Sequence, residues 1–478
     1  MTEFSRRNWL AMAGMAGVAM AGRSAMGTVA RIHGGGGTPP NPFARNVLDF
    51  GARGDGKTDN TTAFQKALDA AHSAGGGIVR VPAGRYLFKG HLTMPANTTL
   101  EGVFGAPPAY VYPDPGNGTV LLPTQGRGRE DGPSFIGVGG PNCTICGLGI
   151  YYPEQDPKAA EPAPYPWAIG IIPSLTGTRS FSAEGAPYPW PTGSVPQQQD
   201  LSVIDVALTN PYQGINLAGA VRHYIARVYG RPLKTGIYVD QCFDVGRIEN
   251  VHFLPFWGGI NNTPMDAWTQ NHGTAFCFGR SDAQYVFNTF CFQYHTGYHF
   301  IQTPSGSCYG NFLGLGADTC HCPVKVDASE FIVGLQITNG EFSGYVGSDP
   351  QGFAVGPDNT GQVCMTNCAF WGGNLKHFGT VRGTGAVSLI GCNFKGTWDM
   401  SNRGEPAILC DGAPTIISNC RFDPVVPANS RRIIAGITKR CAGAVITGNI
   451  TNGTAFTVDR AGELPPGKFQ IHSNIAVG

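Results

Sequence analysis

The chain has 478 residues, a formal net charge of +1 and 14% charged side chains, with 69 Gly and 36 Pro. Because 33 Lys plus Arg nearly balance 32 Asp plus Glu, no overall field exists to attract nucleic acid or an acidic membrane surface. Glycine occurs at about twice its usual share of about 7%, which favours short strands and tight turns over a helical bundle. Fourteen cysteines would suit a disulfide framework in a short secreted domain, but a chain of this length can bury a core without disulfides.

The first 27 residues predict an export signal. Residues 5–10 read Ser-Arg-Arg-Asn-Trp-Leu and precede an Ala-, Gly- and Met-rich stretch, a pattern that resembles a twin-arginine signal. The expected location is therefore the periplasm or the extracellular space. Residues 28–45 are expected to be a linker. No later stretch supplies the roughly 20 consecutive apolar residues of a transmembrane helix, so we expect one domain over residues 46–478 and no membrane partner.

Residues 47–86 predict a turn, a helix and a strand. The segment 47–59 reads VLDFGARGDGKTD and the segment 75–86 reads GGGIVRVPAGRY. Between them, a helix is expected to begin at Asp59 or Asn60 and end near Ala74. Its expected buried positions are Ala63, Phe64, Ala67, Leu68 and Ala71. Asp55 and Asp59 are interpreted as structural, and the helix is expected to cover exposed strand edges at one end of the fold.

These segments resemble the opening of the pectate-lyase-like superfamily, which includes family-28 polygalacturonases, rhamnogalacturonases and phage tailspikes. The resemblance implies an all-β, right-handed parallel β-helix with a short N-terminal capping helix, and a carbohydrate-processing groove on its flank. It does not extend to the family-28 catalytic motifs, because the comparable positions read Tyr-Gln-Gly at 212–214, Lys-Thr-Gly at 234–236 and Asn-His-Gly at 271–273. Only His272 matches, so a polygalacturonase with paired aspartates is disfavoured.

Internal repeats support the same fold. Residues 363–370, 387–394 and 415–422 read VCMTNCAF, VSLIGCNF and TIISNCRF, and their final Phe residues are 24 and 28 positions apart. This period fits one coil of a parallel β-helix, in which equivalent positions stack in columns. The predicted columns are Cys368, Cys392 and Cys420; Phe342, Phe370, Phe394 and Phe422; and an Asn ladder at Asn250, Asn339, Asn367 and Asn419. We interpret them as structural, with the thiols buried and reduced.

Two inserts interrupt the period, at residues 151–200 and 254–272. Inserts in a solenoid form loops on its flank and usually build the binding face. Both inserts are rich in aromatic side chains and also contain carboxylates. The aromatics of the first insert include Tyr188 and Trp190.

The leading hypothesis is a glycoside hydrolase that uses two carboxylic residues. The predicted catalytic residues are Asp240, Asp266, Glu154 and His272, and the predicted sugar-stacking residues are Trp257, Trp268, Tyr165 and Trp167. Glu249 is a reserve candidate, whereas Asp244 and Asp282 are expected to cap turns. His295 and His299 each follow a Tyr, and lining the groove and stacking in the wall of the solenoid are equally expected roles for them.

Two alternatives remain open. A polysaccharide lyase acting on a uronic-acid polymer could use Lys234, Arg231 or Arg247 as its base. A non-catalytic glycan-binding or structural solenoid would need neither acid nor base. No cofactor is expected, and no metal is expected at Cys320-His321-Cys322, because a strand would send His321 to the opposite face from the two cysteines. The expected partner is a poly- or oligosaccharide, and β-helices of this kind often form trimers, so a homotrimer is retained as an expectation.

Overall fold

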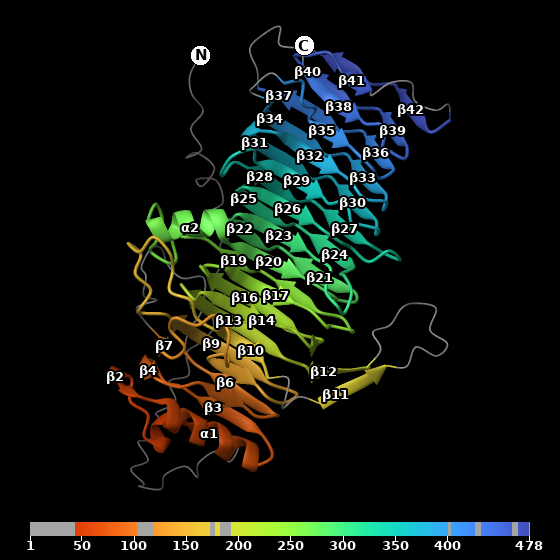
Figure 1. Cartoon of the computed structure of the whole chain (residues 1–478). Coiled ribbons are helices and arrows are strands. Elements are labelled where there is room, and N and C mark those ends of the chain that lie inside the picture. Colours follow the sequence, from red (N-terminus) through yellow and green to blue (C-terminus); the bar gives the residue numbers. More distant parts are fainter. Residues whose placement is uncertain are drawn as a thin grey trace, which may run out of the picture. The chain divides into compact units, whose positions relative to one another are not determined.

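Parallel strands stack in register along the chain in the computed structural model, which describes residues 44–103, 118–172, 177–181, 193–399, 403–425, 432–460 and 467–477. The predicted export signal, most of the linker, Tyr188 and Trp190 lie outside the described residues. Figure 1 shows the strands stacked from the end that carries helix α1 (Thr61–Ser73) toward the last strands of the chain. The predicted all-β, right-handed parallel β-helix is confirmed.

A typical coil contributes three strands. In one coil, β29 (Gln351–Val355) is followed by β30 (Val363–Thr366) and β31 (Ala369–Leu375). Each of these strands pairs in parallel with its equivalents one coil before and one coil after. The same side-chain position therefore recurs about every 4.8 Å along the stack.

Among the described residues, the first strand of a typical coil belongs to a thirteen-stranded sheet and the other two belong to a twenty-seven-stranded sheet, folded at the turn between them. In some earlier coils one long strand, such as β9 or β16, replaces these two. The thirteen-stranded sheet consists of β5 (Leu92–Met94), β8 (Ile136–Val138), β10 (Trp167–Ile171), β14 (Gln213–Asn216), β17 (Thr235–Val239), β20 (Thr274–Phe278), β23 (Thr296–Phe300), β26 (Cys322–Val326), β29, β32 (His377–Val381), β35 (Ile408–Cys410), β38 (Ile433–Ile437) and β41 (Thr457–Arg460). The twenty-seven-stranded sheet consists of β1 (Ala44–Asn46), β2 (Asp55–Asp59), β3 (Gly77–Arg80), β4 (Gly84–Phe88), β6 (Thr98–Glu101), β7 (Thr119–Pro123), β9 (Thr144–Tyr151), β13 (Ser202–Thr209), β16 (Tyr224–Gly230), β18 (Arg247–Glu249), β19 (His252–Phe253), β21 (Gln284–Phe287), β22 (Phe290–Phe292), β24 (Gly310–Leu313), β25 (Gly316–Cys320), β27 (Leu335–Thr338), β28 (Glu341–Gly344), β30, β31, β33 (Val387–Ile390), β34 (Asn393–Trp398), β36 (Thr415–Ser418), β37 (Arg421–Pro424), β39 (Ala444–Thr447), β40 (Ile450–Asn452), β42 (Phe469–His472) and β43 (Ile475–Val477).

The predicted asparagine column lies at the turn within the twenty-seven-stranded sheet. Asn250, Asn339, Asn367 and Asn419 all have φ between 53° and 56°, a left-handed conformation that Asn tolerates better than most residues. The Asn367 amide donates to Asn339 Oδ1 at 2.7 Å. Gly391 takes the equivalent position at φ 64° in the next coil, so the ladder is present but interrupted, because glycine supplies the backbone conformation without the side-chain bond.

The interior contains the predicted apolar columns. Phe394 stacks on Phe370 at a ring-centroid distance of 5.0 Å and on Phe422 at 4.7 Å, with interplanar angles of 8° and 10°. Cys368, Cys392 and Cys420 are at most 1% exposed. All fourteen cysteines of the chain are unpaired, so the core is held by close packing of apolar side chains and thiols.

This packing predicts a specific pattern of thiol reactivity. In the native protein, Cys368, Cys392 and Cys420 should not react with an aromatic disulfide reagent, because they are inaccessible to it. In denaturant, without reductant, all fourteen thiols should react. A denatured count below fourteen would show that disulfides form and would contradict the packing described above.

Helix α1 forms as predicted and buries all five expected residues. The cap is made by Asp59, whose Oδ1 accepts from the Thr61 backbone N–H at 3.0 Å, while Asn60 instead bonds both the N–H and the carbonyl of Arg53. Asp55 accepts from two backbone N–H groups of the following turn, and the Thr58 N–H bond is the main reason that the pKa of Asp55 falls to about 2. Both aspartates are therefore structural, as expected.

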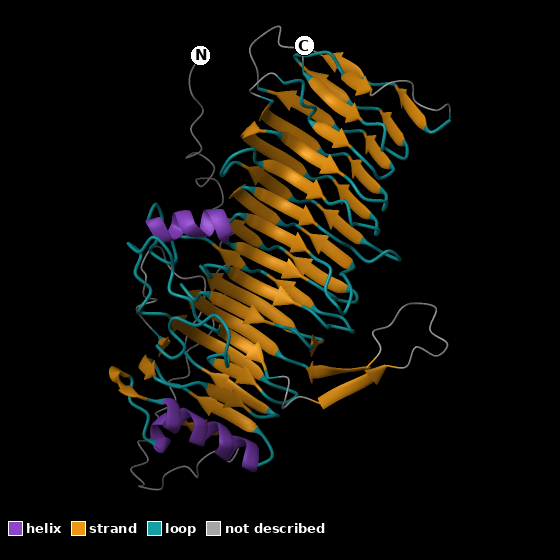
Figure 2. Cartoon of the chain, in the orientation of Figure 1, coloured by secondary structure: helices purple, strands orange, loops and turns teal. Residues whose placement is uncertain are grey.

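The two inserts differ in form. The second insert contains a helix that the loop prediction did not include, α2 (Pro264–His272), which lies outside the strand stack in Figure 2. In the first insert, β11 (Gly177–Phe181) and β12 (Gly193–Gln199) pair as an antiparallel hairpin, and β12 also pairs with β15 (Ala220–Val221). One further short element, the 3-10 helix Val47–Phe50, precedes β2. No helix among the described residues is long and apolar enough to cross a membrane.

Candidate functional site

One outward-facing row on the thirteen-stranded sheet carries the chemically reactive side chains. Tyr238, Cys277, His299 and Lys325 occupy equivalent positions of β17, β20, β23 and β26. Each lies between buried residues, because alternate residues of a strand point to opposite faces. Cys277 is much smaller than Tyr238 and His299, so the row is lowest at Cys277. Tyr238 itself stacks on Trp167 at 6.2 Å between ring centroids.

The Cys277 thiol forms a neutral floor in this row. Burial, reinforced by the carboxylates of Asp240 and Asp327, raises its pKa to about 12. A thiol with that pKa stays protonated at neutral pH and is a poor nucleophile. Covalent catalysis by the Cys277 thiol is therefore disfavoured.

His299 and Lys325 share one carboxylate. His299 Nε2 lies 2.6 Å and Lys325 Nζ 3.2 Å from Asp327 Oδ2. The hydrogen bond from His299 is the main cause that lowers the pKa of Asp327, so Asp327 is ionised and its Oδ2 accepts a hydrogen bond from the Nε2–H group of His299. When Nε2 of a neutral imidazole carries the proton, Nδ1 is left as the acceptor. This arrangement orients a general base.

A cavity of about 270 Å³ begins at Lys325 and Asp327 and continues over β29 and β32. Its lining residues are Lys325, Asp327, Gln351, Ala354, Val355, Gly356, Pro357, Lys376, His377, Thr380 and Arg382. The lining supplies three cationic side chains, from Lys325, Lys376 and Arg382, and the carboxylate of Asp327. Arg382 Nε also lies 3.6 Å from the Asp411 carboxylate. The small excess of positive charge that is left favours an anionic ligand.

Residues that directly precede the strands of this sheet form the border of the same face. Lys234 lies over the Tyr212 ring at 5.6 Å, and its Nζ pairs with Glu130. Farther along, His295 and His321 stack at 4.6 Å between ring centroids. Burial, and next the neighbouring His321, lower the pKa of His295 to about 4. The border therefore combines aromatic, cationic and neutral imidazole groups.

Neutral histidines make the fold sensitive to acid. Burial lowers the pKa of both His223 and His252 to about 4, as it does for His295. When the pKa of a base is lower in the folded than in the unfolded chain, the unfolded chain binds the proton first. The folded protein therefore loses stability as pH falls from about 6.5 toward 4. For the fully buried His223 the loss is about 3 kcal/mol.

We therefore expect the melting temperature to fall steeply between pH 6.5 and pH 4. The variant His223→Gln should be less stable than the native protein at pH 7 and should show a shallower decline with pH. The exposed His472 provides the control, since His472→Gln should leave the pH profile unchanged. A melting temperature independent of pH over this interval would contradict the burial of these imidazoles.

Asp240, a predicted catalytic residue, lies at the end of β17 beside the reactive row. It is 5% exposed. Its Oδ1 accepts from the backbone N–H of Gln241 and Arg280 and from the Thr303 hydroxyl, at 2.8–3.0 Å. Its Oδ2 accepts from the Tyr238 hydroxyl at 3.2 Å. Asp240 thus organises the turns at this end of the sheet and orients Tyr238.

Glu154 and Tyr165, both predicted site residues, contact each other. The Tyr165 hydroxyl donates to Glu154 Oε2 at 3.0 Å, and Arg127 Nε lies 3.6 Å from the same oxygen. The Tyr165 ring is buried against Tyr152. Its ring is therefore a wall contact, and its predicted use as a sugar-stacking surface does not fit this burial.

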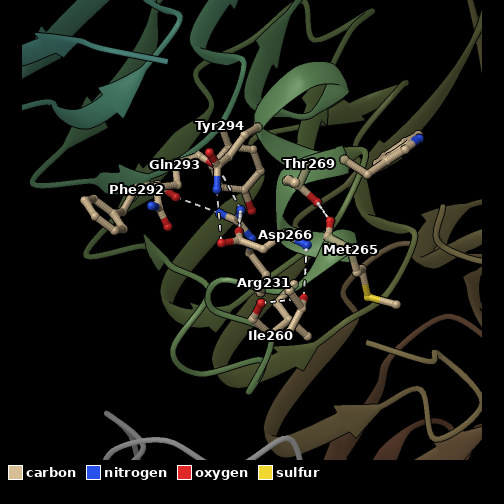
Figure 3. Close-up of polar contacts among 12 residues, drawn as sticks. Arg231, Ile260, Met265, Asp266, Thr269, Phe292, Gln293 and Tyr294 are labelled. Carbon is tan, nitrogen blue, oxygen red and sulfur yellow. Dashed lines mark hydrogen bonds and ion pairs between the residues drawn. The ribbon is translucent and has the colours of Figure 1, made fainter. Parts of the chain in front are cut away.

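The structure places Asp266 on the buried face of α2, where a direct acid or base role does not fit. Asp266 and Arg231 are both fully buried, and Arg231 Nη2 lies 2.6 Å from Asp266 Oδ1 (Figure 3). Burial is the main reason that the pKa of Asp266 is raised. For the same reason Arg231 is inaccessible as the base of a lyase.

The remaining predicted residues divide between the groove and the opposite side. Trp268 contacts Tyr212 at 5.8 Å and stacks on His272 at 4.7 Å between ring centroids, so both residues lie at the border of the reactive face. Trp257 packs against Tyr229 and His252 of the twenty-seven-stranded sheet. Trp257 therefore lies on a different sheet from the one that Trp268 and His272 border. The reserve candidate Glu249 accepts a hydrogen bond from Tyr224 on that same sheet.

Sequence reasoning did not select Tyr238, Lys325 and Asp327, and it left His299 undecided. A signal was available: residues 235–239 read TGIYV and residues 296–300 read TGYHF. Aligning these segments places Tyr238 and His299 at the same position of their coils. Among the described residues, no group of three or more His, Cys, Asp or Glu side chains could hold a metal ion.

Comparisons with known proteins agree with the N-terminal pattern. Residues 44–126 match the family model described as rhamnogalacturonase A/epimerase, pectate lyase-like. A 45-residue segment is 64% identical to alginate lyase 7 of Azotobacter vinelandii, covering 9% of this chain and 5% of the relative. A 64-residue segment is 62% identical to the mannuronan C5-epimerase AlgE3 of the same organism, covering 12% of this chain and 4% of the relative.

A solved structure extends the likeness to most of the fold. The tailspike protein of the E. coli bacteriophage HK620, solved with a pentasaccharide, superposes with a TM-score of 0.53 and 10% identity, covering 86% of this chain and 71% of that chain. At this identity the likeness concerns the fold. With the stacked coils, it shows that this chain is a right-handed parallel β-helix, and the match to the pectate lyase-like family model covers its opening, residues 44–126.

Proposed function

We propose that the chain modifies a uronic-acid polymer by removing the proton at C5 of a sugar residue, as a polysaccharide lyase or a C5-epimerase. The observation that carries this proposal is the cluster of His299, Asp327 and Lys325 beside the low point of the row at Cys277. A sugar ring above Cys277 would lie between His299 and Tyr238.

The groups present match the steps of this chemistry. Lys325 neutralises the sugar carboxylate, which makes the C5 proton more acidic, and His299 Nδ1 accepts that proton. In elimination, the electron pair of the C5–H bond forms the C4–C5 double bond, the C4–O bond breaks, and the leaving oxygen takes a proton from the Tyr238 hydroxyl. In epimerisation, the C4–O bond stays intact and a proton returns to C5 from the opposite face.

Tyr238 is suited to the acid role. Burial, and next the neighbouring Asp240 carboxylate, raise the pKa of its hydroxyl. The hydroxyl therefore stays protonated at neutral pH and is available to donate to a leaving oxygen that becomes basic as its bond breaks.

The carboxylates favour this chemistry over glycoside hydrolysis, the leading hypothesis from the sequence. Hydrolysis needs one protonated and one ionised carboxyl group on either side of the scissile bond. Asp240 is held by four hydrogen bonds, Asp327 by His299 and Lys325, and Asp411 at the far end of the face by Arg440 and Thr438. Asp266, whose pKa is raised, is inaccessible to a polymer.

The sequence comparisons support the choice of polymer. Segments of this chain are similar to segments of an alginate lyase and of mannuronan C5-epimerases. Those segments cover 4–5% of the two relatives. The proposal of a polyuronate substrate therefore rests on the cationic lining of the cavity together with this likeness. Polymannuronate and polyguluronate are therefore the first substrates to test, followed by polygalacturonate.

A substrate panel separates the candidate activities. The purified protein is incubated with these three polyuronates and with a neutral β-glucan, and the products are assayed for reducing ends, ultraviolet absorbance of unsaturated uronate, and changed C5 configuration by proton NMR. Reducing ends with absorbance identify a lyase, and changed configuration without new ends identifies an epimerase. Reducing ends without absorbance identify a hydrolase and overturn the proposal, as does the absence of any change.

A further inference from the structure

The second insert is held by an ion pair that is inaccessible to solvent. Arg231 and Asp266 are each fully buried. Asp266 Oδ2 also accepts from the Asn262 backbone N–H at 3.2 Å and from the Gln270 amide at 3.1 Å. Both carboxylate oxygens are thus engaged, one by the wall of the solenoid and one by the insert itself.

Arg231 connects α2 to two coils of the solenoid, which lie on either side of the coil that carries β19. It follows β16, and its guanidinium donates to the backbone carbonyls of Phe292 and Gln293 at 2.6 and 2.8 Å, at the end of β22 (Figure 3). The same guanidinium lies over the Tyr294 ring at 4.3 Å. One side chain therefore fixes the helix to the strand ends of two coils.

Stability alone does not account for this arrangement. Removing two charges from water is costly, and well-packed apolar residues often replace a buried ion pair without loss of stability. A small apolar cluster of Leu233, Ile260 and Met265 already packs beneath α2. The directional bonds of Arg231 add a defined position of the helix that apolar contacts alone would not fix.

The position of α2 determines what borders the groove. Its last two turns carry Trp268, which contacts Tyr212, and His272, which stacks on Trp268. Gly273 then leads directly into β20, the strand that carries Cys277. A shift of the helix would move both aromatic rings relative to the row of reactive side chains.

We infer that Arg231 and Asp266 are positioning residues that hold α2 as a fixed wall of the polymer-binding groove. Asp266, chosen from the sequence as an acid or base, is thereby reassigned to positioning. The inference rests on the proposed function for its substrate, a polyuronate, but the position of the helix can be measured without any activity.

The test compares Asp266→Asn with the native protein and with a matched control. Asp282→Asn breaks another ion pair of low exposure, in which Arg280 Nε lies 2.6 Å from Asp282 Oδ1 just after β20. Backbone hydrogen exchange of residues 262–272 is measured first. Exchange there should rise at least tenfold in Asp266→Asn and stay unchanged in Asp282→Asn, with the C-terminal coils unaffected in both.

Steady-state kinetics on the preferred polyuronate then separate positioning from catalysis. Asp266→Asn should raise KM about tenfold and change kcat less than twofold, whereas Asp282→Asn should change neither. The double variant Arg231→Met with Asp266→Leu removes the buried charges, so it should fold while keeping the raised KM. If the native protein has no activity, the dissociation constant for polymannuronate replaces KM.

Each other outcome overturns the inference. Unchanged exchange in residues 262–272 shows that the ion pair does not fix the helix. Raised exchange with unchanged KM or affinity shows that the helix does not border the bound polymer. A large fall in kcat with unchanged KM assigns Asp266 to the chemical step. If the protein shows no activity on any polyuronate, the hydrogen-exchange and affinity measurements still test whether the ion pair fixes α2 beside the bound polymer.

Discussion

Replacing His299 with Ala should lower kcat/KM on the preferred polyuronate by about 10²- to 10⁴-fold, the usual contribution of a general base. The Asp327 carboxylate, with Oδ2 2.6 Å from His299 Nε2, orients the imidazole and leaves Nδ1 to accept the C5 proton. Asp327→Asn should have a smaller effect, because the imidazole remains but loses its orienting acceptor. Added imidazole should restore part of the rate in His299→Ala, since the vacated space beside Cys277 can admit it.

The control for this prediction is a histidine far from the row. His472 is exposed on β42 of the twenty-seven-stranded sheet, and His472→Ala should keep full activity. Melting temperatures of all three variants should stay close to that of the native protein, because none of the replaced side chains belongs to the apolar core. Full activity in His299→Ala would remove this residue from the mechanism.

Phe394→Ala should destabilise the C-terminal half of the solenoid by about 3–5 kcal/mol. The ring is 1% exposed and stacks between the rings of Phe370 and Phe422, with a third contact to Phe378. Removal of the Phe394 ring leaves a cavity in the aromatic column, and the closely packed neighbouring side chains cannot easily move to fill it. Because each coil contacts mainly its neighbours, the loss should be localised to adjacent coils.

Urea unfolding measures this loss, and hydrogen exchange locates it. Phe331 is the matched control, since its ring is 53% exposed and Phe331→Ala should change stability by no more than about 0.5 kcal/mol. Equal effects of the two substitutions would contradict the continuous aromatic column.

The repeated elements of the fold were predictable because they depend on local rules. The spacing of Phe370, Phe394 and Phe422 reflects the length of one coil, and the Asn residues at φ near 55° reflect the one-residue turn that each coil requires. The capping helix follows from a buried stripe at helical spacing. The predicted export signal lies outside the described residues, and the coils of a single chain do not test a homotrimer. Both stay predictions.

The site was less predictable because it depends on neighbours that are distant in sequence. Asp266 looks like an exposed loop carboxylate until Arg231, 35 residues earlier, is found to be buried beneath it. His299 and Asp327 are 28 residues apart, one coil of the solenoid, and they meet only once the register of β23 and β26 is fixed. The aromatic content of the second insert pointed equally to Trp268 and Trp257, although Trp268 contacts Tyr212 beside the reactive row and Trp257 packs on the other sheet.

The proposed reaction begins by breaking one bond, the C5–H bond of a uronic-acid residue. It is tested most directly with a polyuronate labelled with tritium at C5, by measuring the label released to water. We expect release to accompany product formation, and both to be lost in His299→Ala but kept in His472→Ala. Cleavage of the polymer without release of the label would contradict proton abstraction and would identify the chain as a hydrolase.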